Sequence, residues 1–213
     1  STLQDLSDVR LSASPAAADP LRQVMGTMYA DAAGPLGALG RESLKVVDRL
    51  ERVSSLDLAE HAYPPTDFGR QLRQTAILLK LQVGLRVVAL DLGGWDTHFA
   101  QGGASGWMAR LLGELATGLA AFLADLGPAS PGVSIVVMTE FGRPARENGS
   151  LGTDHGHGSV MLLLGHKVAG GRVHAAWPGL EDGQLVGPGD LAMTLDYRHV
   201  LAELCLRRLG RTS

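Results

Sequence analysis

The chain has 213 residues, of which 45% are hydrophobic and 19% are charged, with a formal net charge of -3. This length and apolar content predict a globular chain with a real core, and they exclude a disordered chain. The small net charge argues against a general nucleic-acid surface, and we expect no membrane span because the apolar runs are too short.

Five segments have apolar residues at helical spacing, and these segments are predicted to be helices. They are 20–33, 36–53, 68–83, 107–126 and 197–209. Asp67 and Asp196 are the predicted N-caps of the third and fifth helices, and Gly84 ends the third. The single cysteine, Cys205, lies in the last helix and is predicted to pack in the core, so that no intrachain disulfide can form.

Three short apolar runs rich in β-branched residues predict buried strands. They are 85–92, 133–138 and 160–164, and a turn at 170–172 predicts entry into a further short strand. A predicted helix separates the first two strands, and strand, helix, strand is the pattern of a parallel α/β unit. We therefore predict an α/β fold with a mostly parallel sheet covered by helices on both faces. The chain is expected to be one domain over 1–213, with a helical leading segment over 1–66 and the sheet core over 67–213.

Polar side chains follow two of the predicted strands. Asp96 and His98 come after the first strand, and Asp154, His155 and His157 lie in the glycine-rich loop after the second. Neighbouring parallel strands release their loops at the same edge of a sheet, so we expect these residues to meet. Carboxylates and imidazoles are ligands of divalent cations, and the five residues are therefore predicted metal ligands. The alternative is that the aspartates cap turns, that His155 and His157 are solvated, and that His98 packs under Trp95.

Two other charged residues lie close to this predicted site. Glu140 lies just after the second predicted strand. Its predicted role is that of a metal ligand, a general base or the partner that orients a ligand histidine, and the alternative is an ion pair with Arg143. Arg143 is a predicted substrate-binding residue, because a guanidinium matches phosphate or sulfate oxygens, and the alternative is that it holds the loop together through Glu147. The sequence has no phosphate-binding glycine loop and no GxSxG motif, and no serine lies in a recognisable nucleophile context, so we assign no nucleophile.

Four blocks of the sequence together resemble one family. They are GGWDTH (93–98), TEFGR (139–143), ENGSLGTDHGHGS (147–159) and DYRHVLAEL (196–204). The family is the bacterial domain of unknown function 1501, whose members are often labelled as secreted or twin-arginine-exported, and it belongs to the alkaline-phosphatase and sulfatase-like superfamily. The resemblance covers most of the chain from 65 onward, and it implies an alkaline-phosphatase-like fold and a periplasmic or secreted location.

The superfamily implies a hydrolase of small-molecule phosphate or sulfate esters that holds two metal ions. Zinc is the implied metal, with manganese or calcium as alternatives. Asp154 and His155 resemble the adjacent Asp-His ligand pair of the superfamily, and His157 resembles its nearby outer histidine. Asp96 and His98 resemble the other Asp…His ligand set, but they are spaced by two positions where the superfamily has four. Either His98 is not the ligand or the loop is remodelled.

Family members also carry early segments that this sequence lacks, a Gly-Gly-x-Asp-Gly segment and a Ser-His segment. We therefore expect the chain to be the carboxyl-terminal part of a longer protein, with an incomplete fold, a nucleophile outside this chain and weak or no activity alone. The missing section or another copy of the chain would then complete the sheet. The alternative function is a non-catalytic binding or assembly module that retains the fold.

Overall fold

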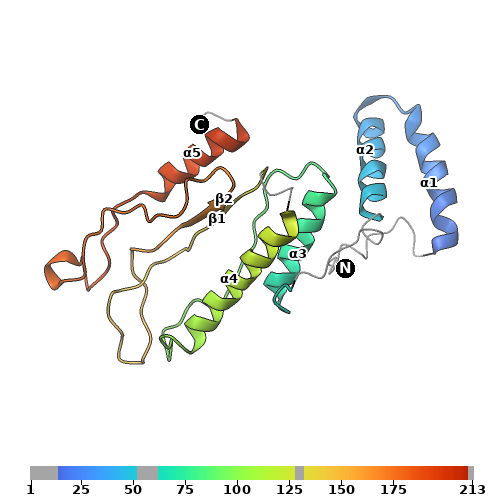
Figure 1. Ribbon diagram of the computed structural model, residues 1–213. Coiled ribbons are helices and arrows are strands. Elements are labelled where there is room, and N and C mark those ends of the chain that lie inside the picture. Colours follow the sequence, from blue (N-terminus) through green and yellow to red (C-terminus); the bar gives the residue numbers. More distant parts are fainter. Residues whose placement is uncertain (1–13, 52–61, 128–131, 211–213) are drawn as a thin grey trace. The chain divides into compact units, whose positions relative to one another are not determined.

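A computed structural model describes residues 14–51, 62–127 and 132–210 (Figure 1). The chain divides into two compact units. The first consists of Ser1–Leu92 with Leu115–Ala129, and the second consists of Gly93–Glu114 with Ser130–Ser213.

The described residues form five α-helices, two strands and a short 3-10 helix. In chain order these elements are α1 (Pro15–Ala30), α2 (Gly34–Glu51), α3 (Asp67–Lys80), α4 (Trp107–Leu126), β1 (Ser134–Val137), β2 (Leu162–Gly165), η4 (Asp182–Gln184) and α5 (Tyr197–Leu209). The five predicted helices are confirmed: α4 and α5 have the predicted bounds, whereas the ends of α1, α2 and α3 are shifted. The last two residues predicted for the second helix, 52 and 53, lie outside the described residues.

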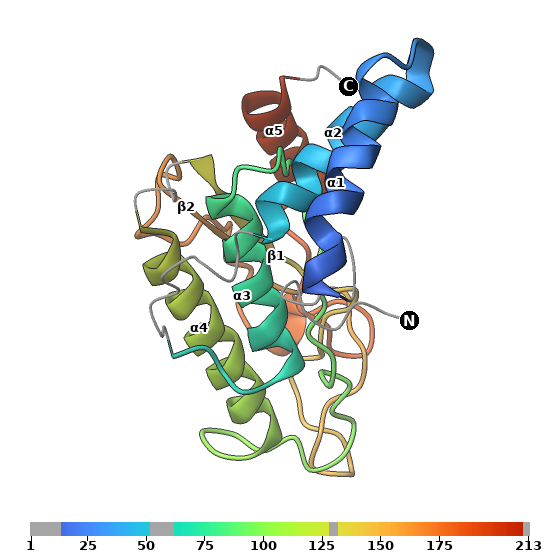
Figure 2. The same cartoon turned by 90° about the vertical axis from the view of Figure 1, so that its right-hand side faces the viewer.

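In the first unit, α3 packs along α4 (Figure 2). The two helices supply apolar side chains that are almost fully buried, namely Phe68, Leu72, Ala76, Ile77, Leu119, Phe122 and Leu126. Gly118 of α4 allows the close approach, because a Cβ there would lie 2.9 Å from Leu72 Cδ1. The N-cap of α3 is Thr66, whose Oγ1 accepts a hydrogen bond from Gly69 N at 3.2 Å, so the prediction of Asp67 as N-cap is wrong.

A buried polar group stabilises the same helix pair. The Asp125 carboxylate of α4 accepts a 2.8 Å hydrogen bond from the Tyr63 hydroxyl and pairs with Lys80 at the end of α3. The pKa of Tyr63 is raised mainly by burial and secondly by the hydrogen bond to the Asp125 carboxylate. By length and composition alone α4 is also long and apolar enough to cross a membrane, but core helices of globular proteins meet the same test.

The sheet differs from the predicted one. Within the described residues there is one sheet of two strands, in which β1 and β2 run antiparallel with Ser134 opposite Gly165 and Val137 opposite Leu162 (Figure 1). The prediction of an alkaline-phosphatase-like α/β fold, with a mostly parallel sheet covered by helices on both faces, is therefore wrong.

The physical reason lies in the connections. A parallel pair needs a strand on each side of a crossover, but the predicted first strand, 85–92, has no strand structure, and Val87 is 71% exposed. After β1 the chain instead makes a long loop, 138–161, that contains no helix and returns directly into β2. A direct return of this kind gives an antiparallel pair. The short strand predicted after 170–172 is absent as well.

The last helix, α5, begins as predicted. The Asp196 side chain accepts a 2.9 Å hydrogen bond from the backbone N–H of Arg198, and Gly210, with φ of 65°, ends the helix in the left-handed conformation. Cys205 of this helix is exposed, so the prediction that it packs in the core is wrong.

Candidate metal centre

Two loops of the second unit lie against each other and carry the candidate site. Backbone hydrogen bonds of 2.9 to 3.3 Å join the loop after Trp95 to the loop before Asp154. Their donors are the N–H groups of Ala100, Gln101 and Thr153. Side chains reinforce the contact, because Gln101 Oε1 accepts hydrogen bonds from Thr97 at 2.7 Å and from Thr153 at 2.6 Å. The two segments that sequence analysis predicted to meet are therefore in contact.

Three of the five predicted ligands converge at this contact. One potential ligand atom from each of Asp96, His98 and His155 lies within 4.8 Å of the others. Asp96 Oδ1 is the common point, since it lies 2.8 Å from His155 Nε2 and 3.0 Å from His98 Nε2. All three side chains are exposed to solvent. The group therefore offers one oxygen and two nitrogens to a cation that arrives from solution.

Asp154 is not one of the three converging residues, but it contacts His98 at Nδ1, the ring nitrogen that does not face Asp96. Its Oδ1 is 2.9 Å from His98 Nδ1 and accepts a 2.9 Å hydrogen bond from Asn148 Nδ2. The same amide group of Asn148 donates to the carbonyl of His98 at 3.0 Å. The hydrogen bond from Asn148, and then that from His98, lower the pKa of Asp154. Asp154 is thus placed to orient His98.

The imidazole of His155 is held by ring stacking. The ring of Phe141 stacks on it at a centroid distance of 3.9 Å, and the ring of His98 lies 4.9 Å away. The hydrogen bond between His155 and Asp96 is the main reason that the pKa of Asp96 is lowered, followed by the charges of His98, His155 and Arg143. Asp96 therefore stays an anion, which is the form that binds a cation.

Arg143 connects the two loops. Its guanidinium donates to the carbonyl of Trp95 at 2.5 Å and to the carbonyl of Thr153, and it lies 3.6 Å from Asp96 Oδ1. The side chain is only 18% exposed. Among the described residues its carboxylate neighbour is Asp96, and neither Glu140 nor Glu147 pairs with it. The structure gives Arg143 a scaffold role, and its role in substrate binding stays a prediction.

Two predicted site residues are not part of the converging group. Glu140 is exposed and makes no hydrogen bond or ion pair with another residue that the structure describes. His157 Nδ1 lies 2.6 Å from a carboxylate oxygen of Asp190, a residue that sequence analysis did not single out. Asn148 and Phe141 were also missed. For Asn148 the available signal was its place in the glycine-rich polar loop, whereas the sequence around Asp190 gave none.

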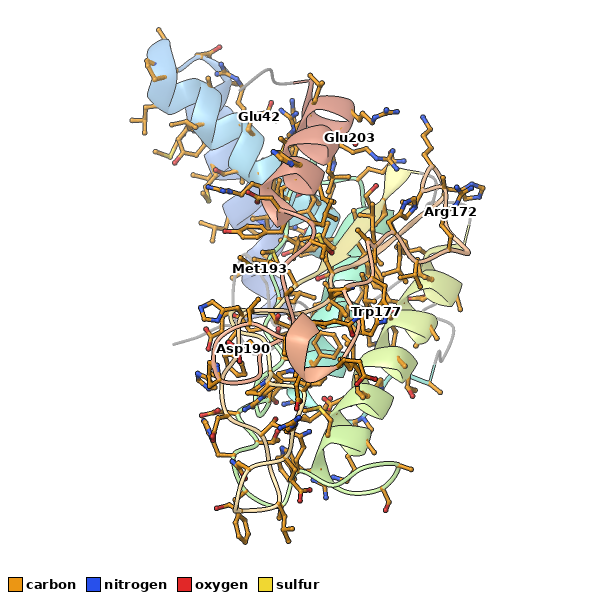
Figure 3. The ribbon with its side chains drawn as sticks, turned by 90° about the vertical axis from the view of Figure 1, so that its left-hand side faces the viewer. Glu42, Arg172, Trp177, Asp190, Met193 and Glu203 are labelled. Carbon is orange, nitrogen blue, oxygen red and sulfur yellow. The ribbon has the colours of Figure 1, made fainter. Side chains whose placement is uncertain are left out.

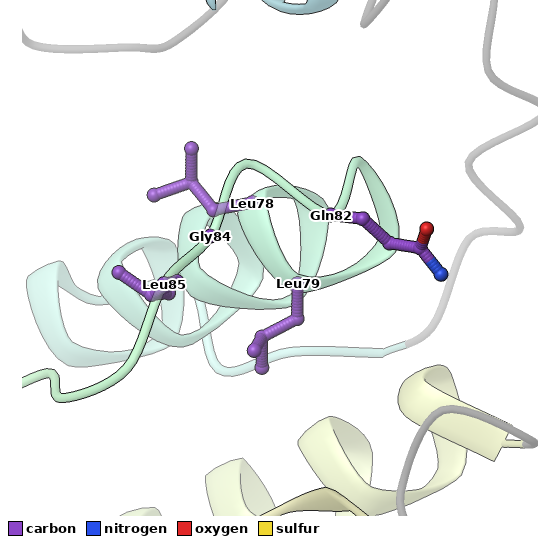
Figure 4. Close-up of a pocket in the computed structure, with 5 residues that line it drawn as sticks. All are labelled: Leu78, Leu79, Gln82, Gly84 and Leu85. Carbon is purple, nitrogen blue, oxygen red and sulfur yellow. The ribbon is translucent and has the colours of Figure 1, made fainter.

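A separate hollow lies at the C-terminal end of α3 in the first unit (Figure 4). It is lined by Leu78, Leu79, Gln82, Gly84 and Leu85. These residues bring neither a charged group nor an imidazole, so the hollow offers no chemistry of the kind found on the polar loops.

By its helices and small antiparallel sheet, the described part of the chain is of the α+β class. It carries a candidate cation site, the exposed Asp–His group, on glycine-rich loops. The family model described as "Protein of unknown function (DUF1501)" matches residues 36–210. The chain belongs to this family, which confirms that part of the resemblance seen in the sequence. Neither the comparison with curated proteins nor the comparison with solved structures gave a match.

Proposed function

We propose that this protein is a metal-dependent hydrolase of phosphate or sulfate esters and that Asp96, His98 and His155 hold its divalent cation. The observation that carries the proposal is the surroundings of His98. Its two ring nitrogens lie 2.9 Å and 3.0 Å from oxygens of two different carboxylates, Asp154 and Asp96. A neutral imidazole has one N–H group and one lone pair. One of the two contacts is therefore favourable only with a second proton on the ring or with a cation at that position.

The donor set fits zinc. Zinc accepts mixed nitrogen and oxygen ligands, and three protein ligands with one open position are the usual set at a catalytic zinc site. Neighbouring ligand atoms in a tetrahedral zinc site are about 3.3 Å apart. The separations of 2.8 Å and 3.0 Å around Asp96 Oδ1 would have to open only slightly. Manganese and calcium prefer more oxygen ligands than this group offers, so they are second choices.

The residues around the ligands support the same assignment. When Asp154 accepts a hydrogen bond from His98 Nδ1, the lone pair of that ring is on Nε2, which faces Asp96. Phe141 fixes the plane of the His155 ring by stacking on it. Arg143 holds the backbone on which Asp96 sits through the carbonyl of Trp95. These contacts would place the three ligands before a cation arrives, which lowers the cost of binding.

A bound divalent cation would act as a Lewis acid toward an ester oxygen. The choice of phosphate or sulfate esters rests on the resemblance of the two Asp/His motifs to ligand motifs of the alkaline-phosphatase and sulfatase-like superfamily, and it does not depend on the fold. The same resemblance supports the proposals that the chain is the carboxyl-terminal part of a longer, exported protein and that it turns over weakly alone. The nucleophile is not assigned to any residue of this chain.

Calorimetric titration of zinc, manganese and calcium into metal-free protein tests the cation site. We expect zinc to bind most tightly, and we expect His98→Ala and His155→Ala to weaken binding strongly. His166→Ala is the matched control, because His166 is an exposed histidine in a turn outside the cluster. If wild-type protein did not bind zinc, or if the control weakened binding as much as the cluster variants, the proposal would be refuted.

The second candidate is a non-catalytic binding module, and the contacts of Arg143 favour it. The guanidinium expected to receive an anionic substrate already donates to the carbonyls of Trp95 and Thr153. Assays of the full-length protein with aryl phosphate and aryl sulfate substrates, each with zinc, manganese or calcium, separate the two candidates. Tight zinc binding without turnover of either ester would favour the binding module.

A further inference from the structure

Asp190 is a buried carboxylate in the coil between η4 and α5 (Figure 3). It is only 2% exposed. Its backbone is fixed on one side by two hydrogen bonds with Val186, of 2.8 Å and 2.9 Å. On the other side it forms a bridge with Pro144, next to Arg143 of the candidate metal centre. The backbone position of Asp190 is therefore fixed by contacts on both sides.

The contacts of this carboxylate are unusually few for its burial. Oδ2 lies 2.6 Å from His157 Nδ1, whereas Oδ1 is buried and has no hydrogen-bond partner among the residues that the structure describes. Removing a carboxylate from water without full compensation is unfavourable, and a buried group that keeps such an arrangement calls for an explanation. The contact with His157 is the one polar contact of this carboxylate within the described residues, so His157 is the side chain that Asp190 can orient.

His157 is anchored at one nitrogen and open at the other. Its side chain is 74% exposed, although Nδ1 contacts a buried group. An ionised carboxylate only accepts hydrogen bonds, and with Asp190 in that form Nδ1 carries the hydrogen. In the neutral ring the lone pair is then on Nε2, at the opposite side of the ring from Asp190. This is the arrangement in which a carboxylate orients a histidine that binds a metal ion.

The backbone places His157 beside the candidate centre. Gly156 separates it from His155 and forms two 2.8 Å hydrogen bonds with Gly142. A Cβ at Gly156 would lie 2.8 Å from the backbone nitrogen of Pro144, so this segment packs directly on the segment that pairs with Asp190. The positions of His157 and Asp190 are therefore both set by 142–144, the segment that also contains Arg143.

We propose that Asp190 is a positioning residue that holds His157 as its Nδ1–H tautomer and so presents Nε2 as a further nitrogen ligand for a divalent cation. The ligand part of this proposal rests on the proposed function, whereas the tautomer part does not. The tautomer is decided within the metal-free chain, by the contact with Asp190.

Long-range proton–nitrogen NMR correlation spectra of the histidine side chains test the tautomer in the full, metal-free chain at mildly alkaline pH. We expect the ring of His157 to be the Nδ1–H tautomer, as we do for the ring of His98 beside Asp154, and the signals of the His157 ring are identified by their loss in His157→Ala. Asp190→Asn should convert that ring to the Nε2–H form, because the amide of Asn can donate to Nδ1. If the ring of His157 is Nε2–H in the wild type, the proposal is overturned, and this result needs no folded Asp190 variant.

Zinc titrations of the same proteins test the ligand part. Asp190→Asn should weaken zinc binding by about 10- to 100-fold, the usual effect of losing a residue that orients a ligand. His157→Ala removes the ligand itself and should weaken zinc binding at least as much. His174→Ala, which changes another exposed histidine, should leave binding unchanged. Wild-type zinc affinity in both His157→Ala and Asp190→Asn would overturn the ligand role of His157. No zinc binding to the wild type, together with the expected tautomer, would instead refute the proposed function and leave the positioning by Asp190 intact.

Discussion

Replacing Gly152 by alanine tests whether the two site loops must approach as closely as they do. A Cβ at Gly152 would lie 2.5 Å from the carbonyl oxygen of Thr97, and it would lie closer still to the carbonyl group of His98. Contacts of a Cβ below 3.0 Å essentially never occur. The Thr97 carbonyl would therefore have to move by at least 0.5 Å, the difference between 3.0 and 2.5 Å, and His98 by more. Because these atoms belong to backbone, no side-chain rotation can relieve the contact.

The expected cost is about 1–3 kcal/mol of unfolding free energy, as for other overpacked sites. Asp96 and His98 lie on one loop and His155 on the other, so the displacement also separates the cation ligands. We expect zinc affinity to fall by about tenfold or more, as it does when the support of a metal ligand is lost. The assays are urea unfolding followed by circular dichroism and calorimetric zinc titration.

Gly149→Ala is the matched control. A Cβ at Gly149 would meet no atom within 4 Å, and its φ is not in the left-handed range. The unfolding free energy of this variant should stay within about 0.5 kcal/mol of the wild type, or rise slightly because alanine restricts the unfolded chain. If Gly152→Ala were as stable as Gly149→Ala and bound zinc equally well, the close approach of the loops would be refuted.

Three other changes have expected outcomes. Arg143→Met should lower the unfolding free energy by about 2 kcal/mol, since hydrogen bonds to charged groups contribute about 1.5–3 kcal/mol each and this side chain is partly exposed. Arg146→Met, at a 70% exposed ion pair, should cost less than about 0.5 kcal/mol, and equal losses in urea unfolding would contradict a scaffold role for Arg143. Asn148→Ala should raise the pKa of Asp154 toward its ordinary value, because Asp154 loses the hydrogen bond that lowers its pKa most. An unchanged pKa of Asp154 in an NMR titration of the metal-free protein would contradict this expectation. Hydrogen bonds from Arg198 lower the pKa of Asp196 from 3.8 to about 2. The contribution of Asp196 to the stability of the folded chain should therefore be complete above pH 3.8 and be lost as the pH falls through about 2. Asp196→Asn should remove this acid-dependent part from thermal unfolding curves, and an unchanged curve would contradict the assignment.

The helices were predictable because their signals are local. Apolar spacing and capping residues act within a few positions of each other, and α4 and α5 begin where these signals place them. The segment 85–92 shows the limit of the same reasoning. An apolar, β-branched run indicates a strand only when a partner is available to pair with it, and the described residues contain none for this segment.

The residue types of the candidate site were readable from the sequence, but their partners were not. Carboxylates and imidazoles crowded among glycines gave Asp96, His98 and His155. The contact of Arg143 with the Trp95 carbonyl could not be foreseen, since every residue has a carbonyl group and the fold alone decides which one is in reach. The same holds for Asp190, which joins His157 across 33 positions through coil that has no periodic pattern.

The two site loops meet for a different reason from the one that sequence analysis gave. We expected the shared edge of a parallel sheet to bring them together, and that sheet is not present in the described residues. Backbone hydrogen bonds between the loops and the guanidinium of Arg143 make the contact instead. A sheet edge would hold loop positions through distant strands, whereas here the geometry of the ligands depends on residues within the loops themselves. The candidate site should therefore be more sensitive to Gly152 and Arg143 than to substitutions in β1 or β2.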